Sequence, residues 1–387
     1  GIKVIVITGD HAITTKAIGE KIGLFEKDDI VLEGKDLDKL TDKQLEKKIS
    51  NIRIIARAMP IQKVRVVKAL QKNGHIVAMT GDGVNDAPAL KKADIGISMG
   101  ITGTDVAKEV SKATLVDDNF ATIVNAIETG RDIYDKLIKS AKFFLSCNMG
   151  EITSVFTAIL LGFPLPLLPL QILMMNMLTD NLPALGLGFE TPEEGIMERK
   201  PRNPKEKPLT GKIFLLIAAF GLIMGLGTLF MFMHAKNIDQ NIYPDEELEG
   251  WSFSGSYNEF KEANPMTGNP DTDSVIMQRE ERLLALPRTI AFTVLVLFQM
   301  FAVMSSRSLF PSLKKLNPFS NFWLLGAVIL SLMIQVIVIY WGPAQFIFGT
   351  TDLLITQWLK IIAVSSLGFI MMEISKFLFK EKKAAAS

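Results

Sequence analysis

The chain has 387 residues, of which 48% are hydrophobic, and its mean hydropathy is +0.28. This composition excludes an intrinsically disordered chain and an ordinary soluble domain. The formal net charge is +1 and no basic stretch is interleaved with aromatic residues, so we expect no nucleic-acid partner. The single cysteine, Cys147, excludes an internal disulfide.

Residues 1–118 alternate short β-rich runs with amphipathic helical runs. This alternation predicts an α/β unit with a parallel sheet, whose functional site lies at the carboxyl ends of the strands. A polar insert, residues 36–50, interrupts the alternation and is expected to form a helix after a turn. The predicted strands are 3–8, 52–56, 76–80, 95–98 and 113–116, and the predicted helices are 13–22, 61–71, 88–92 and 104–111.

Two similar turns follow predicted strands of this unit, namely Thr8-Gly9-Asp10 and the longer stretch Thr80–Asp86 (TGDGVND). In each turn a glycine lets the backbone approach a ligand closely, and a carboxylate follows at the end of the strand. Asp82 and Asp86 lie four residues apart with Asn85 between them, a cluster that suits Mg²⁺ and a phosphoryl group. A short TGD is a weak signal by itself, whereas the longer stretch is specific.

Residues 120–161 contain no proline, and their pattern changes from amphipathic to wholly apolar near residue 143. We therefore predict one long helix, roughly 60 Å at 1.5 Å per residue, whose charged first part, residues 119–142, is a stalk. Gly130 and Gly150 are its weak points, because glycine disfavours a helix interior.

Two apolar segments, 143–163 and 165–189, are each long enough to cross a bilayer as a helix. Each carries one acid, Glu151 in the first and Asp180 in the second. A charge at the bilayer centre costs about 2.5–3.5 kcal/mol on insertion scales. We therefore interpret both acids as ligands of a cation. The alternative is a proline-kinked helical hairpin whose polar groups bond across an interface, which explains the amides but not two acids without a basic partner.

Neutral oxygen donors accompany both acids at helical spacing. They are Asn148 in the first segment, and Asn176 and Thr179 in the second. Pro183 has no N–H, so the carbonyl of Thr179 loses its helical partner and can point elsewhere. An interrupted helix at membrane depth is tolerated where it lines an ion site. A set of carboxylate, amide, hydroxyl and carbonyl oxygens is typical of a site for a hard cation such as Ca²⁺.

Four further apolar segments complete a predicted six-helix transmembrane domain, residues 143–376. They are 213–233, 289–306, 321–341 and 353–372. The loops 190–212 and 307–320 and the tail 377–387 are rich in lysine and arginine, whereas acids outnumber bases in 236–285. The positive-inside rule places the basic segments and the α/β unit in the cytoplasm and the acidic loop outside. The short tail and the lack of a targeting signal favour a bacterial plasma membrane.

The stretch Met79–Asp86 (MTGDGVND), followed by APALKKADIGISMG, resembles the phosphorylation domain of P-type ATPases, a haloacid-dehalogenase-like, Rossmann-type α/β domain. In the membrane part, NMGE (148–151) and NMLTDNLPALGLGFETPEEGIMERKPR (176–202) resemble the calcium-pump branch, close to sarcoplasmic-reticulum-type Ca²⁺-ATPases. The resemblance covers essentially the whole chain. It implies an ATP-driven pump that transports Ca²⁺, uses Mg²⁺ and passes through an aspartyl-phosphate intermediate.

The resemblance also implies roles for residues of the α/β unit. Thr8, with Gly9 beside it, contacts the phosphoryl oxygens, and Asp10 lies near the phosphate and the nucleotide. Lys63 neutralises the transferred phosphoryl group; without the motif, a solvated helix lysine would be the better interpretation. Asp82 holds Mg²⁺ rather than being a simple turn aspartate, and Asn85 and Asp86 order its loop. Positioning and charge neutralisation supply most of the catalysis in phosphoryl transfer.

In the membrane, the resemblance implies a Ca²⁺ site whose ligands are Asn148, Glu151, Asn176, Thr179, Asp180 and a residue of the fourth span. The family has an acid at that last position, and this sequence has Gln299. A neutral amide keeps an oxygen ligand but removes a charge. The sequence therefore leaves open whether one or two ions bind in each cycle.

The family's phosphorylated aspartate, in a DKTGT motif, does not occur in this sequence. The resemblance thus implies the C-terminal half of a pump whose nucleophile, most of its ATP site, actuator, nucleotide-binding domain and first four spans lie outside this chain, which alone is inactive. Two alternatives remain. One is a pump for another hard cation such as Na⁺, motivated by Gln299. The other is a non-catalytic membrane module that binds cations or a partner, motivated by the missing nucleophile.

Overall fold

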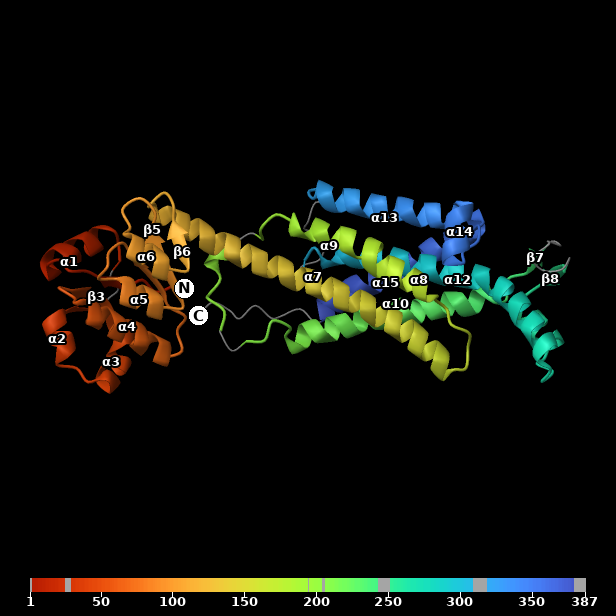
Figure 1. Cartoon of the computed structure of the whole chain (residues 1–387), viewed down its shortest axis with the longest axis horizontal. Coiled ribbons are helices and arrows are strands. Elements are labelled where there is room, and N and C mark those ends of the chain that lie inside the picture. The colour runs from red at the N-terminus through yellow and green to blue at the C-terminus, as the bar shows by residue number, and fades with distance from the viewer. Residues whose placement is uncertain are drawn as a thin grey trace. The chain divides into compact units, whose positions relative to one another are not determined.

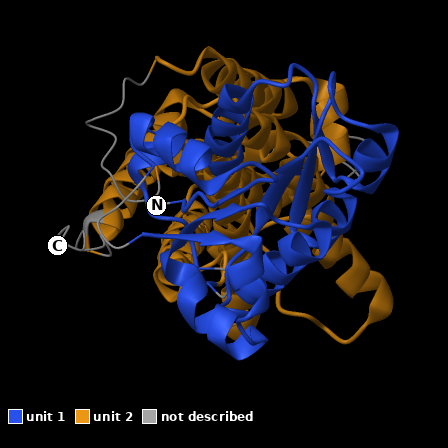
Figure 2. Cartoon of the chain, turned by 90° about the vertical axis from the view of Figure 1, so that its left-hand side faces the viewer, with its two compact units in different colours: residues 1–132, 193–206 blue, residues 133–192, 207–387 orange. Residues whose placement is uncertain are grey.

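The computed structural model describes residues 2–24, 29–193, 195–203, 206–242, 251–308 and 319–378. The order of helices and strands along the chain can be followed in Figure 1. The chain forms two compact units, which Figure 2 distinguishes by colour. The first comprises residues 1–132 and 193–206, and the second comprises 133–192 and 207–387.

The first unit contains two parallel three-stranded sheets rather than the single sheet expected from the alternation. One has the order β1-β3-β2 and the other β4-β5-β6, and every pair of neighbours is parallel. The strands are β1 (Val6–Ile7), β2 (Ile30–Glu33), β3 (Ile52–Ala56), β4 (Ala78–Gly81), β5 (Ile95–Met99) and β6 (Ala113–Leu115). The parallel α/β architecture is thus confirmed, but β2 was not expected, because its apolar core is only three residues long and borders the polar insert.

The polar insert folds as two short helices and a 3₁₀ turn rather than as one helix. Thr41 divides it, because its side chain accepts from Gln44 N at 3.4 Å while Gln44 Oε1 accepts from Thr41 N at 2.9 Å, a reciprocal cap. The helices of the unit are α1 (Ala12–Lys21), α2 (Gly34–Asp38), α3 (Asp42–Lys48), η1 (Ile49–Asn51), α4 (Pro60–Lys72), α5 (Ala87–Lys92) and α6 (Asp105–Val110).

Helix α4 contributes to the cores of both sheets. Val66 and Ala69 pack in a cluster with Ile52 and Ile55 of β3. Val67, on another face of the same helix, packs in a second cluster formed by Val77, Ala89 and Ala93. Because one amphipathic helix serves two clusters, it fixes the two sheets within one unit.

One helix of 41 residues, α7 (Phe120–Leu160), covers the predicted stalk and the first predicted span. Its first residues, 120–132, belong to the first unit and the remainder to the second. Gly130 and Gly150 do not interrupt it. The domain boundaries inferred from the sequence, at residues 118 and 142, stay predictions. The division of the chain into compact units falls between them, at residue 132.

Five helices of the described residues are long and apolar enough to cross a membrane. They are α7, α10 (Gly211–Ala235), α12 (Pro270–Ser306), α13 (Phe322–Tyr340) and α15 (Ile355–Leu378). The remaining predicted span, 165–189, is not a continuous helix: it consists of α8 (Pro169–Met174), the π-helical turn η2 (Met175–Thr179) and α9 (Asn181–Gly188). The π-turn is closed by a bond of 2.9 Å from Asp180 N to Met175 O.

The acidic loop has more structure than its composition indicates. It contains the antiparallel pair β7 (Gln240–Ile242) and β8 (Phe253–Gly255), helix α11 (Tyr257–Ala263) and residues 270–285 of α12. The predicted fourth span began at residue 289, but α12 starts at Pro270 because Asn269 caps it and Pro270 occupies its first position. Two short elements, η3 (Ile196–Glu198) and α14 (Gly342–Phe348), complete the described structure.

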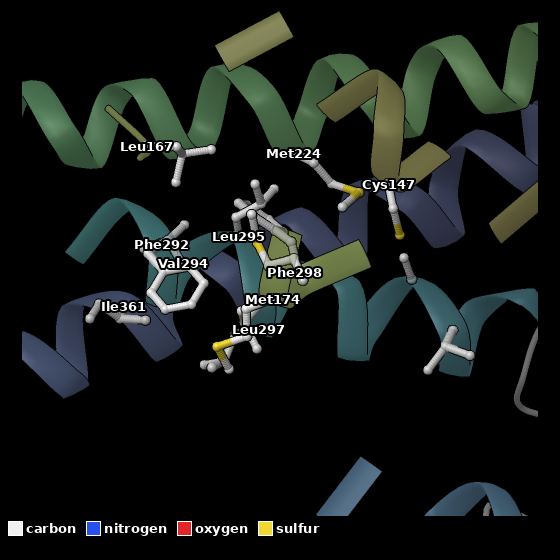
Figure 3. Packing of buried hydrophobic residues seen from close by; sticks show 14 of the residues in the cluster. Cys147, Leu167, Met174, Met224, Phe292, Val294, Leu295, Leu297, Phe298 and Ile361 are labelled. Carbon is white, nitrogen blue, oxygen red and sulfur yellow. The ribbon is translucent and has the colours of Figure 1, made fainter. Parts of the chain in front are cut away.

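Helix α12 forms the centre of the second unit, since 89% of its apolar 18-residue stretch is buried. Figure 3 shows its side chains packed among those of neighbouring helices. The Phe298 ring is held between glycines: a Cβ on Gly227 of α10 would lie 2.7 Å from the ring, and one on Gly368 of α15 only 2.0 Å. This packing fixes the register of Gln299, the next residue along α12.

Candidate functional site

The Thr8–Asp10 turn follows β1 and is held by the neighbouring strand. Thr8 N donates to Ile55 O at 3.0 Å, and Asp10 O accepts from Arg57 N at 3.0 Å. The Thr8 hydroxyl accepts from Asp10 N and donates to Asp10 Oδ2, both at 3.1 Å. All three residues are exposed or half-buried, and a Cβ on Gly9 would meet nothing within 4 Å. The turn is therefore ordered and accessible, and crowding within this chain does not require its glycine.

The second turn, after β4, is tighter because Asp86 folds back over it. A Cβ on Gly81 would lie 2.5 Å from Asp86 Cβ, so only glycine fits there. Asp86 Oδ1 accepts from Lys63 Nζ at 2.5 Å, and both side chains are largely buried. Asp82 and Asn85 stay exposed at the same strand end.

The predicted roles in this loop remain predictions, and the structure adds one contact to them. Lys63, expected beside a phosphoryl group, is paired with Asp86, which agrees with a role of Asp86 in ordering the loop. Asp82 is the exposed carboxylate of the cluster. No hydrogen bond joins the Thr8–Asp10 turn to this loop within the described residues.

In the second unit, three helical segments bring polar side chains together at Glu151. Asn176 Nδ2 donates to Glu151 Oε2 at 3.0 Å, and Gln299 Nε2 donates to Glu151 Oε1 at 3.3 Å. The Thr179 hydroxyl donates to Gln299 Oε1 at 3.3 Å. Glu151 is 6% exposed, and Thr179 and Gln299 are fully buried. Residues from α7, η2 and α12 thus form one hydrogen-bonded network that faces the bundle interior.

Asp180 lies at the junction of η2 and α9 and is fully buried. Neither of its carboxylate oxygens has a hydrogen-bond partner among the described residues. Burying an ionised carboxylate costs several kcal/mol unless it is paired. The position therefore demands either a proton or a cation. Asn148, by contrast, is half-buried, and among the described residues no hydrogen bond brings it into the network.

The interrupted helix supplies further oxygen atoms. Pro183 leaves the carbonyl of Thr179 without its usual helical donor, as the sequence indicates. Asn181 Nδ2 donates to the backbone carbonyls of Asn176 and Met177 at 2.9 and 3.2 Å, so these two carbonyls of the π-turn have a hydrogen-bond donor. Within the described residues no three His, Cys, Asp or Glu side chains are arranged to hold a metal ion. A cation here would depend on two acids together with neutral oxygens.

A buried ion pair that the sequence analysis missed lies at the end of α9. Arg307 donates to both oxygens of Glu190, from Nη2 at 2.8 Å and from Nε at 2.9 Å. Asn321 Nδ2 donates to Glu190 Oε2 at 3.0 Å and to Gly186 O at 2.9 Å. The pair joins the ends of α9 and α12 to the start of α13. The sequence signal was an acid directly after an apolar span, which hydropathy alone assigns to a loop.

Comparison with known proteins agrees with both halves of this description. Residues 164–378 match a family model described as cation transporting ATPase, C-terminus, and residues 1–94 match one described as haloacid dehalogenase-like hydrolase. The chain is 41% identical over 367 residues to a calcium-transporting ATPase of Bacillus subtilis (strain 168), covering 95% of this chain and 36% of that protein.

Two other relatives show the same partial coverage. Calcium-transporting ATPase 1 of Bacillus cereus is 39% identical over 377 residues, which cover 97% of this chain and 39% of the relative. An endoplasmic reticulum-type calcium-transporting ATPase 4 of Arabidopsis thaliana is 35% identical over 395 residues, with 97% and 37% coverage. The chain therefore spans less than two fifths of the length of these relatives.

Proposed function

The chain belongs to the cation-transporting P-type ATPases, and from this premise we propose that it is the C-terminal portion of an ATP-driven Ca²⁺ pump. It is an integral, multi-pass membrane protein. Its relatives are calcium-transporting ATPases from bacteria and a plant. The proposed substrates are Ca²⁺ and ATP, the proposed membrane is a bacterial plasma membrane, and the remainder of the pump supplies the nucleotide site.

The observation that carries the proposal is the pair of buried acids among neutral oxygens. Glu151 is held by two amides from other helical segments, and Asp180 has two oxygens without a partner among the described residues. No basic side chain of the described residues bonds to either acid. A hard cation would satisfy the orphaned oxygens and offset the cost of burying them.

The α/β unit fits a supporting role in phosphoryl transfer. Asp82 presents an exposed carboxylate, while the neighbouring Asp86 is engaged by Lys63. One free carboxylate suits Mg²⁺, which keeps several waters and takes only one or two protein carboxylates. Bound there, Mg²⁺ would neutralise charge on a phosphoryl group. Lys63 and Asp86 would hold the loop in place, and the Thr8 hydroxyl would orient phosphoryl oxygens.

The two sheets indicate where an additional strand could pair. β1 pairs only with β3, and β4 pairs only with β5 among the described strands. The free edges of β1 and β4 therefore belong to the two strands that end in the TGD turns. We propose that a strand of the complete pump pairs there and supplies the phosphorylated aspartate between Thr8 and Asp82.

The proposal is tested by Asp180→Asn in the complete pump. This change keeps the shape of the side chain but removes its charge, so Ca²⁺-dependent phosphorylation from ATP should be lost. A melting temperature equal to that of the wild type would show that the variant is folded. Ca²⁺ activation of the variant at wild-type concentrations would place the transport site elsewhere.

Gln299 favours one second candidate, a pump for a monovalent hard cation. The family resemblance implies an acid at this position, and this chain has a neutral amide, so the proposed site carries one negative charge fewer than a site with that acid. Measuring phosphoenzyme formation with Ca²⁺, Na⁺ or neither decides between the candidates. Activation by Na⁺ in the absence of Ca²⁺ would reverse our choice of ion.

A further inference from the structure

The loop after β5 forms a small cradle of backbone N–H groups, and Asp118 fills it. Gly100 N and Ile101 N donate to Asp118 Oδ1 at 2.6 and 3.1 Å. Thr102 donates to Oδ2 from both its N–H and its hydroxyl, each at 2.8 Å. Consecutive N–H groups that converge in this way are an anion-binding nest. Burial raises the pKa of Asp118, but the bonds from Thr102, Ile101 and Gly100 outweigh it and lower the pKa to about 2.

The backbone of Asp118 is held in a conformation that its residue type disfavours. Its φ is +49°, in the left-handed region. Among non-glycine residues of the described structure, only Arg57 also has a positive φ. Such a conformation persists where surrounding contacts determine it. The four bonds to the nest are those contacts.

The nest is also connected to the loop that carries Asp82. Thr104 N, two residues after the last nest residue, donates to Asp82 O at 2.8 Å. A Cβ on Gly103 would lie 2.0 Å from Met99 O, so the backbone between the nest and Thr104 is closely packed. A shift of the Asp82 carbonyl would therefore move the nest.

On its other side, Asp118 lies directly before the long helix. α7 starts at Phe120, and Asn119 caps it by accepting from Ala121 N at 3.0 Å. Asp117 supports this cap by accepting from Asn119 N at 3.1 Å and from the Thr122 hydroxyl at 2.6 Å. Asp117 and Asp118 thus divide two tasks. Asp117 stabilises the start of α7, and Asp118 attaches that start to the nest.

We propose that Asp118 is a positioning residue that joins the Asp82 loop to the first turn of α7. Ordering of the Asp82 loop would fix its carbonyl, then Thr104 and the nest, and through Asp118 the start of α7. The joint itself stands on the contacts above. Its use, transmission of Mg²⁺ and phosphoryl binding to the helix, rests on the proposed function.

The test uses amide hydrogen exchange on the complete pump, with and without Mg²⁺ and beryllium fluoride as the phosphoryl mimic. Without ligand, Asp118→Asn should speed exchange at residues 100–102 about tenfold or more, because losing a charge-assisted bond is worth at least that factor. Asp117→Asn is the matched control, since it removes the charge that supports the start of the helix but leaves the nest intact. It should leave exchange at residues 100–102 within a factor of about two.

Addition of the ligands then separates a joint from a merely structural contact. In the wild type, protection should rise both around Asp82 and in residues 120–124. In Asp118→Asn it should rise around Asp82 but not in 120–124, and Asp117→Asn should retain both responses. Unchanged exchange at 100–102 in Asp118→Asn, or ligand protection of 120–124 that survives this variant, would overturn the proposal.

Two controls keep the outcomes distinct. If the ligands fail to protect the Asp82 loop even in the wild type, the proposed phosphoryl site fails, whereas the ligand-free comparison still tests the joint.

The pH dependence gives a second check. Because the pKa of Asp118 is lowered from its ordinary 3.8 to about 2, the contact is fully present above about pH 4 and is lost only as the pH falls toward 2. Intrinsically corrected protection at 100–102 should therefore be flat between about pH 5 and 8, and a decline within that range would contradict the assignment.

Discussion

At the scale of single residues, Gln299 is the neutral member of the proposed membrane site. Its amide donates to Glu151 and accepts from Thr179, so it bridges α7 and η2 without adding charge. Gln299→Glu would place a third carboxylate beside the first two. We expect tighter Ca²⁺ binding, by about tenfold for one additional charged ligand at roughly 1.4 kcal/mol. Titration of Ca²⁺-dependent phosphorylation in the complete pump measures this change.

The control for that substitution is Gln299→Leu, which has a similar volume but removes both hydrogen bonds. It should weaken Ca²⁺ activation, because Glu151 Oε1 loses its only donor from α12. The Glu variant should also become more sensitive to acid, since protons compete for a third carboxylate. Equal Ca²⁺ affinity in all three proteins would remove Gln299 from the site.

Residue spacing in the sequence places Glu151, Asn176 and Thr179 in one polar cluster, and the family resemblance adds Gln299. In the structure these four side chains are hydrogen-bonded to one another, because polar groups within an apolar span are buried against each other rather than against lipid. Asn148 does not join them: residues three apart on a helix differ by about 60° in direction, enough to turn one side chain from the cluster. The pairing of Lys63 with Asp86 was beyond sequence reasoning, since it depends on how α4 packs against the loop.

At the scale of elements, the close approach of α7 and α10 depends on glycines. A Cβ on Gly225 would lie 2.5 Å from Thr153 Cβ and 2.8 Å from Gly150 O, so the helices would have to move apart. We expect Gly225→Ala to destabilise the bundle by about 1–3 kcal/mol, the usual cost of overpacking. Thermal unfolding of the detergent-solubilised pump measures the loss.

The matched control lies on another spanning helix. A Cβ on Gly326 of α13 would meet nothing within 4 Å, so Gly326→Ala should be neutral or slightly stabilising through its helix propensity. Because Thr153 lies two residues after Glu151, Gly225→Ala should also weaken Ca²⁺ activation. Equal melting temperatures for the two variants would show that this contact does not constrain the bundle.

Element types were predictable where a long pattern repeats and were not where a short local bond decides. The parallel α/β alternation and the 41-residue helix α7 followed from periodicity and from the absence of proline. The break at Thr41 depends on one reciprocal cap, and the π-turn depends on which carbonyl accepts from Asp180 N. Hydropathy cannot distinguish these local choices: Pro183 predicts the interruption of the helix, but nothing in the sequence predicts the π-turn that precedes it.

At the scale of the whole molecule, α7 is the one helix of the described residues that contributes to both units, with residues 120–132 in the first and 133–160 in the second. It starts beside Asp118 and carries Glu151 thirty-three residues later. A helix of this length transmits displacement only while its backbone hydrogen bonds are continuous. The sequence already indicated this continuity, but only the packing of Gly150 against Met224 explains why a glycine is tolerated in it.

Ser140→Pro in the complete pump tests whether that continuity matters for transport. Proline removes one backbone donor and clashes with the preceding turn, which kinks a helix at a cost of about 3 kcal/mol or more. Ser140 lies between the start of α7 and Glu151, so we expect ATP turnover to persist while Ca²⁺ uptake into vesicles falls by at least about tenfold for each ATP used. Ser140→Ala keeps the helix and should leave the ratio unchanged. A normal ratio of Ca²⁺ transported to ATP hydrolysed in Ser140→Pro would show that α7 does not couple the two processes. Loss of both activities together with a lowered melting temperature would show a folding defect. In that case Ser140→Gly, which weakens the helix less, separates a folding defect from uncoupling.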